Sequence, residues 1–129
     1  MDTTAPSGAL RGVLWTSGAL AIGCALLAAG HLGLGIPVLS ALGPGGTRAV
    51  VPAAIAFAVA ALLHTLVGVG VAGGRSWAWP VGVLIAALTL LGAATPFRGA
   101  MSAVGIALAG IQLVLLLTRD GRALLQRAS

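Results

Sequence analysis

Few side chains in this 129-residue sequence could take part in chemistry, because the chain contains no Lys, Glu, Asn or Tyr. Those that interrupt long apolar stretches include Ser17, Cys24, His31, His64 and Gln112. A neutral imidazole offers one donor and one acceptor, and an amide side chain offers both kinds, so His64 and Gln112 could satisfy each other's hydrogen bonds. Histidine also changes charge close to physiological pH, which makes His64 the candidate for a proton or ligand contact.

Catalysis and metal binding are not predicted from these residues. The two carboxylate side chains, Asp2 and Asp120, lie outside the long apolar stretches. No pair of carboxylates can therefore form within those stretches. Ser17 with His64 is the one conceivable nucleophile and base, and no third group is available to orient them. One Cys and two widely separated His cannot supply the ligands of a zinc or copper site. We therefore expect no enzymatic activity, no metal and no cofactor.

The composition indicates a membrane protein. Apolar residues make up 59% of the chain and charged residues 7%, whereas an ordinary soluble domain is about 45–50% apolar and about 25% charged. The same values exclude a disordered chain, which would be poor in apolar residues. The net charge of +5 comes from Arg residues spread singly along the sequence, and this spacing does not predict nucleic-acid binding.

Arginines divide the apolar sequence into candidate membrane spans. The charge-free runs cover residues 12–47, 49–74, 76–97 and 99–118, and they contain 36, 26, 22 and 20 residues. A hydrocarbon core of about 30 Å requires about 20 helical residues, so each of the last three runs holds one span. In the first run, Pro37 and the Gly-Pro-Gly-Gly stretch at 43–46 favour a turn and end the span early.

The sequence therefore predicts an all-α integral membrane four-helix bundle in a single domain, residues 1–129, with antiparallel neighbouring helices. Helices are favoured because lipid offers no partner for open backbone groups, and the alternating pattern of a barrel strand is absent. The predicted spans are residues 11–34, 50–72, 77–95 and 99–118, with an external loop up to about residue 49 and a basic tail at 119–129.

Charge and aromatic residues predict the orientation of these spans. With the N-terminus inside, five Arg residues lie on the inner side and two, Arg48 and Arg98, on the outer side, which favours both termini in the cytoplasm. Indole rings prefer the headgroup boundary, and all three Trp residues fall at predicted inner ends. The predicted interface anchors are Trp15, Trp77, Trp79, Arg11, Arg75 and Arg119. Dual topology is an open alternative, because the charge bias is small.

Depth along the spans brings three polar residues to one level. With a rise of about 1.5 Å per residue, Ser17 and His64 lie about 9 Å from the inner boundary and Gln112 about 10–12 Å. We expect a hydrogen-bonded layer in the inner third of the bilayer, which fixes helix register or, alternatively, carries a proton or ligand. His31 lies about 30 Å from that boundary, where an interfacial or packing role is expected.

Small residues at helical spacing predict which helix faces meet. Lipid tails do not drive apolar helices together, so close packing must do so, and residues three or four apart share one face. The predicted rows are Ser17, Ala21, Ala25, Ala29 and Gly33; Ala56, Ala60, His64, Gly68 and Ala72; Gly82 and Ala86; and Ser102, Gly105, Ala109 and Gln112.

Two segments allow more than one interpretation. Arg11 and the apolar run up to Cys24 resemble a lipoprotein signal sequence, but the run continues past Cys24, so we expect a retained span with Cys24 as a small buried side chain. In the tail, Asp120 and Gly121 indicate the end of the last span. The basic residues after them either rest on anionic inner-leaflet lipid or form a disordered tail.

In overall character the sequence resembles the uncharacterised small four-span integral membrane proteins of GC-rich, actinobacterial-type bacteria. Its most individual passages are Leu63-His64 before Gly68 and the Arg-Ser-Trp-Ala-Trp-Pro junction at 75–80. The resemblance implies a place in the inner membrane and no particular activity. The sequence lacks the first-span Glu of small multidrug exporters and the Asn and Thr-Phe-Ser-Thr-Phe segment of fluoride channels.

These features predict a non-enzymatic membrane protein that serves as a structural or accessory subunit, or that associates with itself. Its expected partners are the lipid bilayer and either further copies or a larger membrane complex. No nucleic acid is expected, and the sequence specifies no small-molecule ligand. One alternative is a small-molecule or ion transporter or channel with a path past His64 and Gln112. A second is a holin-like pore former, based on size and the basic tail.

Overall fold

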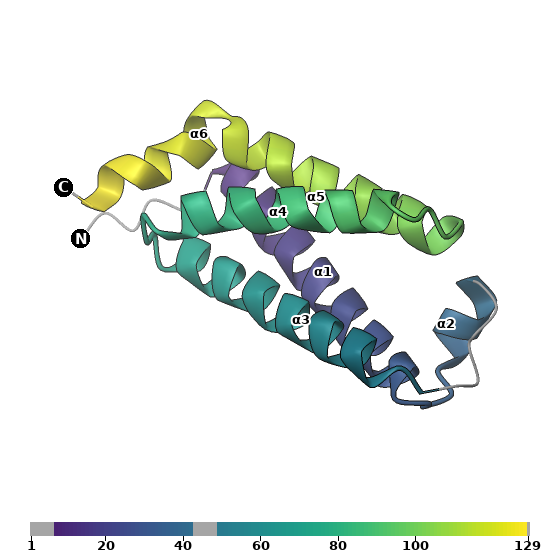
Figure 1. Ribbon diagram of the computed structural model, residues 1–129. Coiled ribbons are helices and arrows are strands. Elements are labelled where there is room, and N and C mark those ends of the chain that lie inside the picture. The colour runs from purple at the N-terminus through teal and green to yellow at the C-terminus, as the bar shows by residue number, and fades with distance from the viewer. Residues whose placement is uncertain (1–6, 43–48, 129) are drawn as a thin grey trace.

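Long helices make up most of the chain in the computed structural model, which describes residues 7–42 and 49–128 (Figure 1). The elements are α1 (Gly8–His31), α2 (Pro37–Leu42), α3 (Val51–Ala72), α4 (Ala78–Ala94), α5 (Ala100–Leu117), α6 (Arg119–Arg122) and the 3₁₀ helix η1 (Ala123–Ala128). Within those ranges there is no β-strand, which confirms the all-α prediction.

The four long helices begin and end within three residues of the predicted spans. Local signals set several of these ends. The Ser7 hydroxyl accepts from the Leu10 backbone N–H at the start of α1, and a proline occupies the first turn of α3. Gly99 precedes α5 with a φ of 70°, a conformation that favours glycine. Helices α1, α3 and α5 are long and apolar enough to cross a membrane, whereas α4, with 17 residues, is shorter.

The predicted external loop contains a short helix that was not expected. α2 begins at Pro37, where the fixed φ of proline suits the first helical position and its missing N–H breaks no helical bond. A methyl group of Leu39 lies over Gly30 of α1, 2.8 Å from the position that a Cβ would take there. Residues 43–48, including Arg48, lie outside the described residues.

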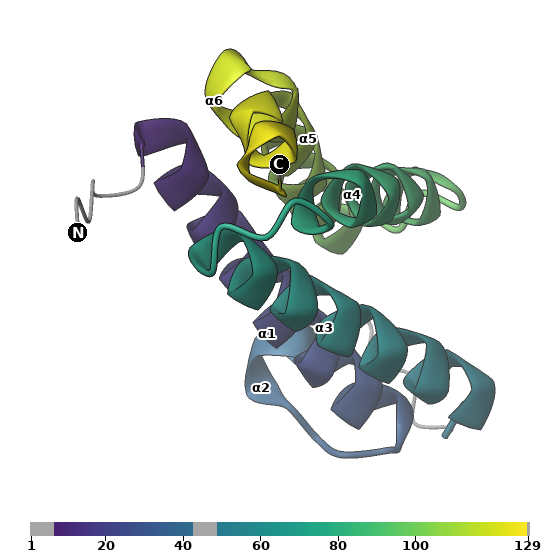
Figure 2. The same ribbon diagram turned by 90° about the vertical axis from the view of Figure 1, so that its left-hand side faces the viewer.

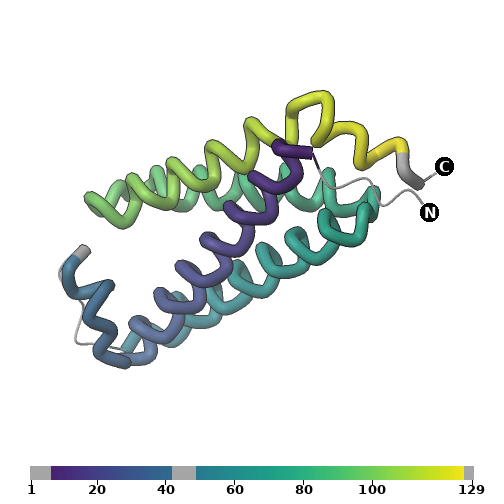
Figure 3. Tube along the Cα trace, turned by 180° about the vertical axis from the view of Figure 1, so that it is seen from behind, coloured from purple at the N-terminus to yellow at the C-terminus, as the bar shows by residue number. Residues whose placement is uncertain are grey.

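The long helices form two antiparallel pairs. α1 lies along α3, and α4 lies along α5 (Figures 1 and 2). The pairs meet at the end of the molecule where α1 begins and α5 ends, and they diverge toward α2 (Figures 1 and 3). We call the first of these ends the closed end and the second the open end.

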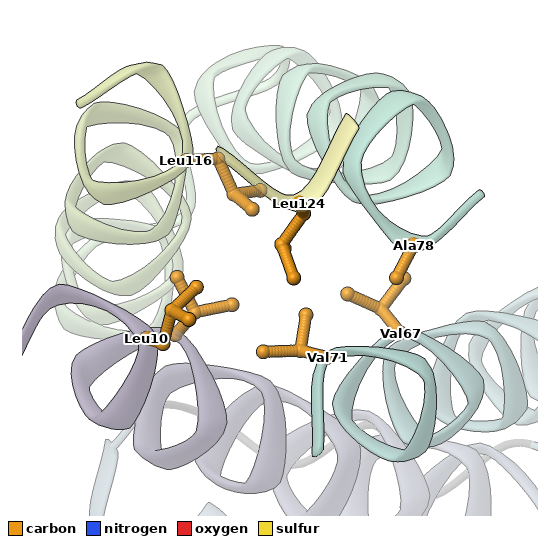
Figure 4. Packing of buried hydrophobic residues seen from close by; sticks show 7 residues of the cluster. Leu10, Val67, Val71, Ala78, Leu116 and Leu124 are labelled. Carbon is orange, nitrogen blue, oxygen red and sulfur yellow. The ribbon is translucent and has the colours of Figure 1, made fainter. Parts of the chain in front are cut away.

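A cluster of buried apolar side chains holds the closed end together. It draws on all four long helices and on η1, and its side chains point toward one another (Figure 4). The members are Leu10, Val13, Val67, Val71, Ala78, Leu116 and Leu124. Beside them, the Trp79 indole N–H of α4 donates to the Leu116 carbonyl of α5 over 2.7 Å, which ties those two helix ends together.

The tail folds back onto the closed end, so the alternative of a disordered tail is wrong for its described part, whereas contact with lipid stays a prediction. The Gly121 N–H donates to the Thr118 hydroxyl, and a Cβ at Gly121 would lie 2.6 Å from the Leu115 carbonyl oxygen, so only glycine fits this tight turn. The turn brings Leu124 into the apolar cluster with 0% of its surface exposed, whereas Leu125 remains 45% exposed. The physical reason is the gap between the helix ends, which Leu124 fills.

Two of the predicted small-residue rows do not describe the buried faces. On α1 the buried residues beyond Ser17 are Leu20, Cys24 and Ala28, while Ala25 is exposed; on α3, Ala56 is exposed. A helix turns by about 100° per residue, so a strict step of four drifts by about 40° each time and leaves the face. The rows on α4 and α5 are shorter or contain a three-residue step. Their buried members are Gly82, Ala86, Ser102, Ala109 and Gln112.

Replacing Leu124 with alanine tests the docking of the tail. The change removes a fully buried side chain, so we expect Leu124→Ala to lower the free energy of unfolding by about 2–5 kcal/mol. The matched control is Leu125→Ala, which truncates the neighbouring exposed leucine and should leave the thermal midpoint nearly unchanged. Thermal unfolding of the detergent-solubilised chain, followed by circular dichroism, compares the two. Equal midpoints for both variants would contradict the docked tail.

Candidate functional site

Two side-chain hydrogen bonds lie next to the apolar cluster, on the side toward the open end. The Gln112 amide of α5 donates to the Ser17 hydroxyl of α1, with 2.9 Å between Nε2 and Oγ. The His64 imidazole of α3 bonds to the Thr89 hydroxyl of α4, with 3.0 Å between Nε2 and Oγ1. Both contacts connect residues far apart in the sequence. Each therefore fixes the position of one helix against another.

The two hydrogen bonds join the two helix pairs to each other. One links α1 to α5, and the other links α3 to α4, so each bond runs from the first pair to the second. Ser17 also packs against Gly68 of α3, where a Cβ would meet the Ser17 Cβ at 3.5 Å. Polar contacts between apolar helices fix register because the side chains have no alternative partner in lipid. We call Ser17, Gln112, His64 and Thr89 the polar link.

The three residues predicted to share a layer are all buried, but the expected bond between His64 and Gln112 is not formed. His64 and Gln112 are both 0% exposed, and Ser17 is 1% exposed. The partner of His64 is Thr89, which sequence reasoning missed. Counting residues from the inner end puts Thr89 about 18 Å up, about 9 Å above His64. Counting residues gives the depth only if every helix is upright. The two helix pairs diverge (Figure 1), so the count places His64 and Thr89 at different depths although they are in contact.

Two atoms of the polar link keep unused hydrogen-bonding capacity. His64 Nδ1 and Gln112 Oε1 are buried and have no partner among the described residues. Unpaired buried polar atoms are uncommon and costly, about 1–3 kcal/mol each. If the Thr89 hydroxyl donates to His64 Nε2, the ring proton of His64 is on Nδ1, which is then a donor without an acceptor. Gln112 Oε1 is an acceptor without a donor. The polar link therefore leaves one ring nitrogen of His64 and the amide oxygen of Gln112 without a hydrogen-bond partner among the described residues.

Beyond the polar link, the helix pairs enclose a cleft that extends to the open end. Its volume is about 1560 Å³, and its walls come from α2 and all four long helices. Most lining side chains are apolar, with Leu20, Leu63 and Ile85 among them. Thr89, the partner of His64, is among the lining residues, and Arg98 lines the cleft at the open end. The cleft thus joins an apolar interior to a cationic mouth.

His31 and Cys24 also line this cleft, and both have packing contacts. The His31 Nδ1 donates to the Leu27 carbonyl over 2.7 Å, and its ring lies 5.2 Å from the ring of Phe57 on α3. Cys24 is a free, buried cysteine in the middle of α1. These contacts agree with the packing roles expected for both residues.

The predicted interface anchors lie near the closed end but differ in exposure. Trp15 is 81% exposed and Trp77 44% exposed, as an anchor facing headgroups would be. Trp79 is half-buried, and its indole N–H is already engaged by α5. The three basic anchors, Arg11, Arg75 and Arg119, have exposed side chains.

No three His, Cys, Asp or Glu side chains lie close enough to hold a metal ion within residues 7–42 and 49–128. Comparisons with protein-family models, with curated proteins and with solved structures found no match to this chain. The functional argument therefore rests on the geometry of the polar link and the cleft.

A double-mutant cycle tests the link between α1 and α5. We expect Ser17→Ala and Gln112→Leu to be coupled by about 0.6–1.7 kcal/mol in the free energy of unfolding, because the two side chains share one hydrogen bond. The control cycle combines Ser17→Ala with Thr89→Val, which belong to different bonds, and should show a coupling below about 0.5 kcal/mol. Reversible unfolding in mixed micelles measures both cycles. Equal couplings in the two cycles would show that Ser17 and Gln112 are not specific partners.

Proposed function

We propose that this chain is an integral membrane protein that crosses the bilayer four times and has a structural or accessory role rather than an enzymatic one. The single observation that carries the proposal is the distribution of its side chains. Large apolar residues cover the outside of the helices, with Ile22, Leu62 and Leu91 between 59% and 65% exposed, while His64, Gln112 and Ser17 are buried. This arrangement suits lipid as the surrounding solvent.

The charged residues support the same proposal, because they lie at helix ends. Arg11, Arg75 and Arg119 flank the closed end, and Arg98 flanks the open end. α4 is the shortest of the four proposed spans, since its 17 residues extend about 25 Å, less than a hydrocarbon core of about 30 Å. A short span is accommodated by local thinning of the bilayer and by flanking side chains. The excess of Arg residues at the closed end favours that end in the cytoplasm, with both termini.

A structural or accessory role follows from what the buried polar side chains do. The Ser17 hydroxyl accepts from Gln112, and His64 is bonded to Thr89, so the one conceivable nucleophile and base are engaged by other partners. Their contacts hold the two helix pairs together. Apolar outer faces of this extent also provide surfaces for further copies of the chain or for other membrane subunits.

Cysteine labelling on both sides of α4 tests the four-span arrangement at its shortest helix. In a Cys24→Ala background, we expect Thr95→Cys to react with a membrane-impermeant maleimide in intact cells. Ser76→Cys should react only after permeabilisation, because one span separates the two positions. Reaction of both cysteines from the same side would exclude a spanning α4. Reversed accessibility would keep four spans and overturn the cytoplasmic assignment of the termini.

A transporter or channel is the second candidate function, favoured by the two unpartnered atoms of the polar link, whose residue Thr89 lines the cleft. On this proposal, purified protein in liposomes dissipates a proton gradient, and His64→Leu abolishes the flux while the protein still accumulates. The control is Thr65→Val, which alters an exposed hydroxyl bonded within its own helix. On the structural proposal, the unmodified protein and both variants leave the proton gradient intact, and His64→Leu lowers the thermal midpoint of unfolding.

A further inference from the structure

The cleft between the helix pairs combines features that match an amphiphile. Its volume of about 1560 Å³ exceeds the roughly 300–1,000 Å³ of pockets that hold compact small molecules. Apolar walls run from the polar link to the open end, where Arg98 is one of the residues that line the mouth. A long apolar chain would therefore contact the walls, while an anionic group at its end would meet the cation.

Arg98 is available for such an anion. Its backbone N–H donates to the Ser102 hydroxyl, which anchors the residue, but its guanidinium makes no hydrogen bond or ion pair with the described residues. The described carboxylate, Asp120, lies in α6 at the closed end. Gly99 and Met101 of the uncapped first turn of α5 line the mouth beside Arg98, and free N–H groups at a helix start also favour anions.

We propose that the cleft binds one anionic membrane lipid, with an acyl chain between the helix pairs and its headgroup at Arg98. The inference rests on the membrane insertion proposed above. Guanidinium groups bind phosphate oxygens through charge-assisted, often bidentate hydrogen bonds, which are stronger than neutral ones. The positive mouth would thus distinguish an anionic lipid from a zwitterionic lipid with the same chains.

Charge and shape favour a lipid over a helix from a second copy. The carboxylates of this chain are at positions 2 and 120, so no predicted span of a second copy carries an anion for Arg98. The pairs diverge steadily from the polar link (Figures 1 and 3), and a rigid helix about 10 Å wide cannot follow a tapering space. An acyl chain can. Open space remains along the walls, because a Cβ at Gly23 or Gly92 would meet nothing within 4 Å.

Native mass spectrometry of the full chain, extracted from membranes in mild detergent, tests the proposal. Phosphatidylglycerol and phosphatidylcholine with identical chains are the probes. We expect one phosphatidylglycerol per chain, bound about tenfold more tightly than phosphatidylcholine, and we expect Arg98→Gln to abolish this preference. The control Arg75→Gln removes an exposed cation at the closed end and should keep the preference. Equal affinity for both lipids, or equal effects of the two Arg variants, would overturn the proposal.

Blocking the cleft provides a second test with matched controls. Gly92→Leu projects a side chain into the cleft and should lower phosphatidylglycerol binding at least tenfold, whereas Gly18→Leu adds the same bulk at an exposed glycine outside the lining and should not. Circular dichroism verifies that both variants keep their helices. If Gly92→Leu instead breaks a dimer without changing lipid binding, the occupant is a second copy and the lipid proposal is wrong. A chain that remains in the aqueous fraction would refute membrane insertion, a separate outcome.

Discussion

Two hydrogen bonds between side chains determine how the halves of this molecule are joined. Within each half, α1 lies along α3 and α4 along α5. Between the halves, Gln112 reaches Ser17 and His64 reaches Thr89. In the lipid surroundings that we propose for this chain, no hydrophobic force drives one apolar helix onto another, so such contacts, together with close packing, decide which faces meet. The polar link is therefore the constraint on how the two helix pairs are held toward the open end, beyond the apolar cluster.

The position of the polar link explains the different ends of the bundle. Toward the closed end, the pairs are close enough for seven apolar residues to pack together, one of which, Leu124, comes from the tail. Toward the open end, no comparable cluster joins the pairs in the described residues, and the cleft opens. A closed end packed with apolar side chains and an open end lined by apolar walls thus lie on opposite sides of one junction. The lipid site at Arg98 uses the second of them.

Much of this architecture could be predicted from the sequence because charged and helix-breaking residues are so rare. Arg75 and Arg98, with the Gly-rich turns, delimit the long helices to within a few residues. The cost of burying polar groups predicted that Ser17, His64 and Gln112 would face inward. The helix tilts could not be predicted, since they depend on packing between pairs. That is why Thr89 was missed and why His64 was assigned to Gln112.

Three other features, the small-residue rows, the docked tail and α2, were also missed or predicted incorrectly because the sequence does not reveal tertiary contacts. Rows with a strict spacing of four failed on α1 because a helical face advances by 3.6 residues per turn, as Cys24 and Ala28 show. The tail was expected to rest on anionic lipid or to be disordered, since its pattern shows one apolar pair, Leu124 and Leu125. Nothing in the sequence reveals the gap that receives Leu124. α2 was hidden in a stretch of turn-forming residues, where Pro37 served as a helix start rather than as a stop.

Distances between spin labels across the two ends of the bundle test the central claim most directly. Labels at Ile55 on α3 and Leu91 on α4 report on the open end, and labels at Val69 and Leu117 report on the closed end; all four positions are exposed. When the polar link is removed by Ser17→Ala, Gln112→Leu, His64→Leu and Thr89→Val together, we predict that pulsed electron resonance in lipid nanodiscs shows a broadened open-end distance distribution. The closed-end distribution should stay narrow, because the apolar cluster remains. An open-end distribution that is as narrow as in the unmodified protein would contradict the account.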